Sequence, residues 1–131
     1  MNDIRAAIRS YLLADSTVSS LVGGTRIHNV QLPQGQVDPS VVFIKISEIG
    51  DYKMDGDSNL GHMRMQFDAW AQNADAATEL ANAVYDRLSG AKGLMDTVIV
   101  KGIFMDVGRD DYDAVAKMFR SSRDYFIWYD L

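Results

Sequence analysis

A clean alternation of apolar and polar positions over residues 63–70 is the feature that most restricts how this chain folds. One set of positions holds Met63, Met65, Phe67 and Ala69, and the other holds Arg64, Gln66, Asp68 and Trp70. Successive side chains of a β-strand point to opposite faces of its sheet, so this period of two predicts a strand with one face in a core. The chain must therefore build a sheet and cover the apolar face of that sheet.

Periodicities elsewhere in the chain predict what accompanies this strand. Residues 3–13 and 74–89 repeat apolar side chains at helical spacing, and Asn73 is the expected N-cap of the second helix. The other expected elements are, in chain order, a short helix with Ser16 as its N-cap and Gly23-Gly24 after its end, a strand at 26–30, a loop at 31–40, a strand at 41–49, a hairpin tip at 50–61, a linker at 91–96, a strand at 97–107, a turn at 108–113 and a strand at 117–129.

This order of elements predicts an α+β fold, with a mostly antiparallel β-sheet covered on one face by an N-terminal helix and a central helix. Strand–helix–strand units do not recur often enough to build a doubly wound parallel sheet. A length of 131 residues fits one domain. We therefore expect residues 1–131 to form a single domain whose core needs neither a disulfide nor a structural metal.

Charge and cysteine content exclude several classes of protein. Acidic residues outnumber basic ones by 18 to 13, so the chain has no bulk attraction for nucleic acid or anionic lipid. Cysteine is absent, which excludes thiol catalysis and zinc–thiolate sites. No apolar run reaches the roughly 20 residues of a membrane-spanning helix, and the first residues lack a signal pattern. We expect synthesis in the cytoplasm and no membrane partner.

Aspartates near residue 57 offer a weak candidate for a metal site. Asp55, Asp57 and Asn59 alternate like the first half of a calcium-binding loop. However, Leu60 stands where that loop needs glycine, and Gln66 stands where it needs a bidentate glutamate. An exposed hairpin turn is the better interpretation of this segment.

The remaining polar clusters show no catalytic pattern. Asp110, Asp111 and Asp113 are interpreted as a solvated acidic turn. Neither His28 nor His62 lies in a metal-binding motif or in a spacing that suggests a Ser-His-Asp arrangement. Glycine-rich phosphate loops do not occur either. We therefore expect no catalytic residue, no metal and no cofactor, and a protein that is not an enzyme.

Large aromatic side chains at the end of the chain suggest a contact surface. Along the last strand, Phe126 and Trp128 face opposite to Tyr125, and Trp70 lies on the face opposite Phe67. Since aromatic residues are enriched in interface cores, Trp70, Phe126 and Trp128 are the candidate subunit interface. The alternative is a core that wraps around the strand end.

Eight short segments carry a family resemblance. They are LVGGTRI at residues 21–27, LPQG at 32–35, PSVV at 39–42, RMQFDAWA at 64–71, ANAV at 81–84, DYD at 111–113, FRSSRDY at 119–125 and IW at 127–128. In this order and spacing, the chain resembles the small tail-completion or tail-terminator proteins of long-tailed, siphovirus-like bacteriophages and prophages.

The resemblance implies a structural virion assembly protein without turnover. Such a protein forms a ring, usually a hexamer, that caps the head-proximal end of the tail tube, ends tube polymerisation and provides the surface for head–tail joining. Its partners would be other copies of the chain, the tail-tube protein and a head–tail connector or stopper protein. DNA would pass through the lumen without specific binding, past acidic side chains that are either those of Asp55 and Asp57 or those of Asp110 to Asp113.

Two polar, glycine-containing loops are the candidates for docking to the tube or the neck, because such loops can become ordered on contact. The first holds Gln34 and Gly35, and the second holds Asp55, Gly56, Asp57 and Asn59.

Other functions stay open from the sequence. One alternative is a head–tail stopper or another neck ring protein, which would bind the portal or adaptor instead of the tube. A second is a small ligand-binding α+β dimer, with Arg123 and Tyr125 as members of its pocket. An enzyme is the third and is disfavoured by the missing motifs.

Overall fold

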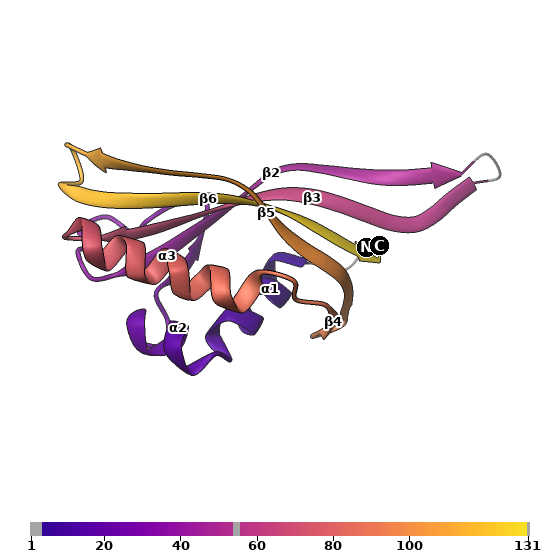
Figure 1. The fold of residues 1–131 in the computed structure, drawn as a ribbon, viewed down its shortest axis with the longest axis horizontal. Coiled ribbons are helices and arrows are strands. Elements are labelled where there is room, and N and C mark those ends of the chain that lie inside the picture. The colour runs from indigo at the N-terminus through magenta and orange to yellow at the C-terminus, as the bar shows by residue number, and fades with distance from the viewer. Residues whose placement is uncertain (1–3, 54–55, 131) are drawn as a thin grey trace.

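The computed structural model describes residues 4–53 and 56–130 (Figure 1). Its elements are α1 (Ile4–Leu13), α2 (Ser16–Leu21), β1 (Ile27–Asn29), β2 (Ser40–Lys53), β3 (Gly56–Ala71), α3 (Ala74–Leu88), β4 (Gly93–Met95), β5 (Val98–Asp113) and β6 (Met118–Asp130). The order matches the expected one, with an additional short strand, β4, inside the expected linker. No helix among the described residues is long and apolar enough to cross a membrane.

All six strands belong to one curled, mixed sheet in the order β1-β2-β3-β6-β5-β4. β1 runs parallel to β2, and the other neighbours are antiparallel. The central pair is β3 with β6, in register from Leu60↔Asp130 to Ala71↔Phe119. The α+β class expected from the sequence is therefore confirmed, with a parallel strand added at one edge.

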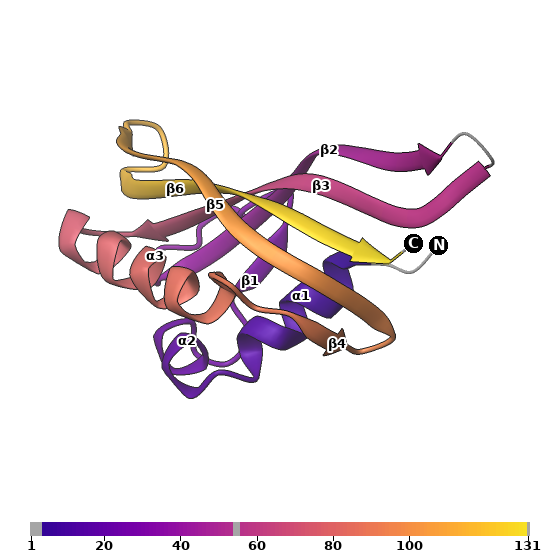
Figure 2. The same ribbon diagram turned by 45° about the vertical axis from the view of Figure 1, so that its right-hand side comes forward.

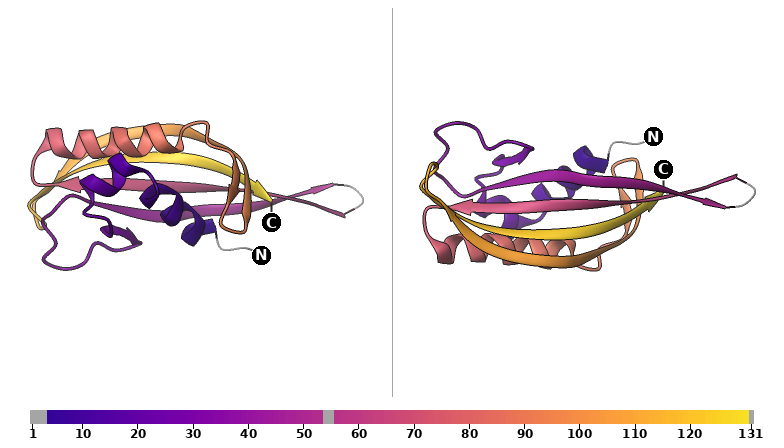
Figure 3. Two further views of the ribbon diagram at one scale, coloured as in Figure 1. Left: turned by 90° about the horizontal axis from the view of Figure 1, so that it is seen from below. Right: turned by 90° about the horizontal axis from the view of Figure 1, so that it is seen from above.

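The helices lie together on one side of the sheet (Figures 1 and 2). Seen from the opposite side, the strands lie in front of the helices (Figure 3, right). The main core fills the space between the two layers and includes Ile8 of α1, Leu80 of α3, Phe67 of β3 and Tyr125 of β6. The alternation of residues 63–69 predicted which side chains of β3 face this core. The prediction is confirmed, since Met63, Met65, Phe67 and Ala69 are all buried there.

Helix ends follow the expected chemistry with one correction. The side chain of Asn73 accepts a hydrogen bond from the backbone N–H of Ala76, which confirms it as the N-cap of α3. The N-cap of α2 is Asp15 rather than Ser16, since the Asp15 carboxylate accepts from the N–H of Val18. Gly23 follows α2 with a φ of 60°, a left-handed conformation that favours glycine.

The tips of both long hairpins are shorter than the sequence predicts. The expected tip at 50–61 is mostly paired strand, because β2 continues to Lys53 and pairs with β3 from Gly56. The expected turn at 108–113 is also strand, and the chain reverses after Asp113. There the Asp113 carboxylate accepts from the N–H groups of Val115 and Ala116, so it closes the turn that follows. Turn-forming aspartates are tolerated in these strands because a partner strand holds the backbone.

Replacing Asn73 should destabilise α3. Asn73→Ala removes the acceptor for the Ala76 N–H, and the free energy of unfolding should fall by about 1 kcal/mol. Urea unfolding followed by circular dichroism measures this change. Asn73→Asp keeps a capping oxygen and should stay close to the unmodified chain; equal losses in both variants would contradict the capping role.

The buried tyrosines should make stability depend on alkaline pH. Burial raises the pKa of the Tyr125 hydroxyl from 10.0 to about 12, and burial and a hydrogen bond to Glu48 also raise the pKa of Tyr129. Since the folded state holds these protons more tightly, the stabilisation is complete below pH 10, and the part due to Tyr125 disappears as the pH rises toward about 12.

Urea midpoints measured across this pH range test the effect. Tyr125→Phe should flatten the alkaline decline and leave only the part that belongs to Tyr129. A variant that retains the full slope would show that Tyr125 does not cause it.

Candidate functional site

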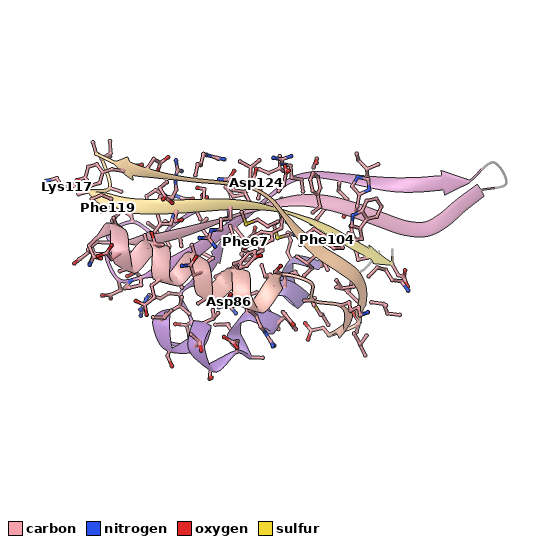
Figure 4. All side chains as sticks on the ribbon, in the orientation of Figure 1. Phe67, Asp86, Phe104, Lys117, Phe119 and Asp124 are labelled. Carbon is pink, nitrogen blue, oxygen red and sulfur yellow. The ribbon has the colours of Figure 1, made fainter. Side chains whose placement is uncertain are left out.

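The sheet face that points away from the helices, called here the outer face, collects the polar side chains of the alternating strands. The pairing register places Arg64 of β3 beside Phe126 of β6, and Asp68 beside Ser122. Figure 4 shows Asp124 on this face, whereas Phe67 points toward the helices. The outer face has a polar end near the β5–β6 turn and an aromatic end toward the β2–β3 hairpin.

Two arginines organise the polar side chains, Arg120 within the polar end and Arg64 where the polar end meets the aromatic end. Nη2 of Arg64 lies 2.8 Å from Oδ2 of Asp124, and Nη1 lies 3.0 Å from Oδ2 of Asp106. Arg120 forms an ion pair with Asp111 and lies 4.0 Å from Asp68. The bond to Arg120 lowers the pKa of Asp111, and the bond to Asp124 raises the pKa of Arg64. Each arginine is therefore held by two aspartates from other strands of the sheet.

Further polar groups extend the contacts of Arg120 with Asp68. Ser122 donates to Oδ1 of Asp68 at 2.5 Å, and Gln66 donates to the same oxygen at 2.8 Å. Arg109 of β5 in turn donates to Gln66 at 3.2 Å. Side-chain contacts therefore cross β3, β6 and β5, and we call them, together with the Arg64 ion pairs, the arginine–aspartate network. It satisfies polar groups that the sheet places away from the core.

Aromatic side chains occupy the other end of the outer face. The rings of His62 and Trp128 are 4.2 Å apart, and the Arg64 guanidinium lies 5.3 Å from the ring centre of Phe126. The ring of Phe104 covers Gly102, where an added Cβ would lie 2.8 Å from a ring carbon. Phe104 nevertheless leaves 56% of its surface exposed. This end is the part of the outer face that offers apolar surface.

The three residues expected at the subunit interface do not share one environment. Phe126 and Trp128 lie on the aromatic end of the outer face and are partly exposed. Trp70 is buried in a second, small cluster with Val42 and Met118. The Arg120 guanidinium lies 5.2 Å from the Trp70 ring. The chain itself therefore covers Trp70 and leaves little of its ring for another subunit.

The two candidate docking loops lie at opposite ends of the molecule. Gln34 and Gly35 line an open cleft with Trp70 and Val115, next to the β5–β6 turn. The hairpin of β2 and β3 projects at the other end of the long axis (Figure 1). Gly56, Asp57 and Asn59 belong to the start of β3 in that hairpin, and Asp55 lies outside the described residues.

The candidate metal and ligand positions have other roles where the structure describes them. Asp111 and Asp113 are engaged by Arg120 and by the turn after β5. Within residues 4–53 and 56–130, no group of three or more acidic or histidine side chains is placed to hold a metal ion. Arg123 lines an open groove beside Asn82, to which it donates at 2.6 Å, whereas Tyr125 is fully buried in the core. Of these two residues, only Arg123 lines that groove.

The arginine–aspartate network is the feature that sequence reasoning missed. A signal was present, because Arg64, Gln66 and Asp68 alternate on β3 as Arg120, Ser122 and Asp124 alternate on β6. Their pairing across the sheet depends on a register that the sequence alone does not fix.

One family model and one solved structure are similar to this chain. A family model described as "Tail completion protein gp17" matches residues 6–130. A chain of the solved structure "Virion of native gene transfer agent (GTA) particle" is similar in fold, with a TM-score of 0.75 and 19% identity, over 98% of this chain and 95% of that chain. No curated protein sequence matches this chain.

Removing the hydroxyl of Ser122 should destabilise the fold. Ser122 is fully buried and donates to the buried carboxylate of Asp68, so Ser122→Ala should lower the free energy of unfolding by about 1–3 kcal/mol. Ser20→Ala, at an exposed position, is the matched control and should change it by less than about 0.5 kcal/mol. Chemical denaturation of both variants gives the comparison; equal effects would mean that the network does not stabilise the sheet.

Proposed function

Because the chain belongs to the Tail completion protein gp17 family, we propose that it is a structural virion protein that completes a phage-type tail. In this proposal, about six copies form a ring at the head-proximal end of the tail tube. The ring ends tube polymerisation and presents the surface that the head–tail connector or stopper binds. The chain is made in the host cytoplasm and remains in the finished particle.

The opposite placement of the two docking segments is the observation that carries this proposal furthest. The loop at Gln34 and Gly35 and the β2–β3 hairpin occupy opposite ends of the long axis. A protein that ends a tube must fit the tube on one side and present a different surface on the other. Two unlike ends on one rigid sheet meet that requirement.

The charge distribution suits a channel that conducts DNA. The chain carries a net charge of −5, and Arg64 and Arg120 of the outer face are each held by aspartates. Arginines that already bind carboxylates are poor partners for phosphate, because binding would have to displace an existing ion pair. DNA is therefore expected to pass the ring without being held.

Removing the chain during particle assembly tests this function. Without the cap, the tube should continue to grow, so cells should accumulate headless tubes longer than normal, which electron micrographs would show. Expression of the unmodified chain should restore joined particles of normal tail length. Headless tails of normal length would instead favour the stopper, which acts after the tube has ended.

Shortening the β2–β3 hairpin should leave folding of the chain intact and impair the joining of heads to tails. Gly50 pairs with Gly61, so replacement of residues 51–60 by Asn-Gly gives these strands a two-residue turn of a favoured type. The core residues of β3 begin at Met63, and the variant should therefore fold normally by circular dichroism. Particles assembled with it should have far fewer joined heads and tails.

A matched variant in the other loop serves as the comparison. Gly35→Ala changes one residue of that loop, where φ is 82°, and leaves the hairpin intact. Normal joining with the shortened hairpin would contradict a docking role for the hairpin. A loss in both variants would mean that both ends contribute.

A further inference from the structure

The two outermost positions of the sheet differ in how the chain protects them. Arg9 of α1 donates to the carbonyl oxygens of Ile27 and Thr25, at 2.9 and 3.1 Å, and thereby occupies acceptors beside β1. On the other side, β4 pairs with Val98–Val100 of β5, and the N–H of Gly90 binds the carbonyl of Ile103.

Two long segments, one of β2 and one of β5, lack such cover among the described residues. β1 pairs with β2 only at Val41–Phe43, so the edge of β2 is open from Ile44 onward. β5 is paired only with β6 from Phe104 to Asp113, so its second edge is open there. We call these segments the β2 edge and the β5 edge. Open edges present unpaired backbone groups that can pair with another strand.

Exposed apolar side chains concentrate on the same two segments. Of the twelve large apolar residues exposed in the described part of the chain, six lie there, each 40–56% exposed. They are Ile46 and Ile49 on the β2 edge, and Phe104, Met105, Val107 and Tyr112 on the β5 edge. Apolar groups beside open backbone indicate a contact that a single copy does not make.

Strand direction makes the two edges complementary. β2, β3, β6 and β5 alternate in direction, so β5 runs opposite to β2. If a second copy is placed with its β2 edge along the β5 edge of the first and its outer face on the same side, the two strands are antiparallel. The alternation then continues from one copy into the next.

We propose that neighbouring copies join by pairing the β5 edge of one with the β2 edge of the next. This inference rests on the proposed ring and identifies its seam. The contact is heterologous, with two different edges of one sheet, which is the kind of interface that generates a ring when the rotation closes. In the register that opposes the whole of both open segments, Ile46 lies near Tyr112 of the neighbouring copy and Ile49 lies near its Val107.

Irregularities in both edges restrict which strands can pair. The β2–β3 register shifts between Lys45 and Ser47, and the β5–β6 register shifts between Met105 and Gly108. Ile46 and Val107 lie within these shifts. Bulges bend a strand and increase its twist, which disfavours pairing with an arbitrary flat strand. They favour a partner strand that is itself bent, and both edges of a second copy carry such an irregularity.

Disulfide cross-linking tests the seam directly, because the chain has no cysteine of its own. Ile46→Cys or Ile49→Cys is combined with Met105→Cys, Val107→Cys or Tyr112→Cys in one chain. Opposed positions in paired strands are close enough for a disulfide. At least one combination should give a ladder of covalent multimers on a denaturing gel after mild oxidation, whereas each single variant should stop at the dimer.

Leu94→Cys combined with Val115→Cys is the matched control. These positions are 73% and 96% exposed but lie on neither edge, so no ladder is expected from them. A charge at the seam gives an independent check. Ile46→Lys should raise the concentration needed for association by about tenfold or more, because a lysine would lose water at the contact, while Val115→Lys should leave that concentration unchanged.

The mass of the unmodified chain, measured in parallel by native mass spectrometry, separates this inference from the proposed function. A ring without ladders from any edge combination overturns the seam and leaves the function standing. Covalent multimers from an edge combination, together with open assemblies of variable copy number in the unmodified protein, support the seam and contradict the ring. A chain that stays monomeric at the highest concentration and gives no ladder overturns the seam as well, since both edges were then available and did not pair.

Discussion

The pairing of β3 with β6 is the contact on which the rest of the structure depends. It runs in register over twelve residue pairs, from Leu60↔Asp130 to Ala71↔Phe119. Because side chains alternate along both strands, this one register determines which side chains lie on each face of the sheet. It places Met65 and Tyr125 in the core and joins Arg64 to Asp124 on the outer face. A shift of one residue would bury the arginine–aspartate network and expose the core.

Local patterns in the sequence predicted which helices and strands form better than they predicted where those elements end. The alternation around Phe67 and the cap at Asn73 depend on neighbouring residues, and both are confirmed. The hairpin ends were wrong because Asp, Asn and Gly favour turns locally, while cross-strand partners such as Arg120 for Asp111 keep the strand paired. Family membership was predicted from short segments in order. The environment of the candidate interface residues was harder to predict from the sequence. Burial of Trp70 depends on Leu32 and Met118, which are distant from it in the sequence.

One sheet in this account provides three kinds of surface. Its inner face is closed by the helices, and its polar side chains on the outer face largely satisfy one another. The β2 and β5 edges and the two ends of the long axis are the surfaces that remain for other molecules to bind. In the proposed assembly the edges bind other copies of the chain and the ends bind different proteins. A structural protein needs no catalytic group for either task, since its specificity comes from the placement of surfaces.

Cryo-electron microscopy of the head–tail junction would test the central claim most directly. The account predicts density for this chain in a single ring between the last tube ring and the neck, with the β2–β3 hairpins of all copies pointing the same way along the axis. Density for the chain repeated along the tube, or confined to the far end of the tail, would contradict the proposal that it completes the tail at the head-proximal end.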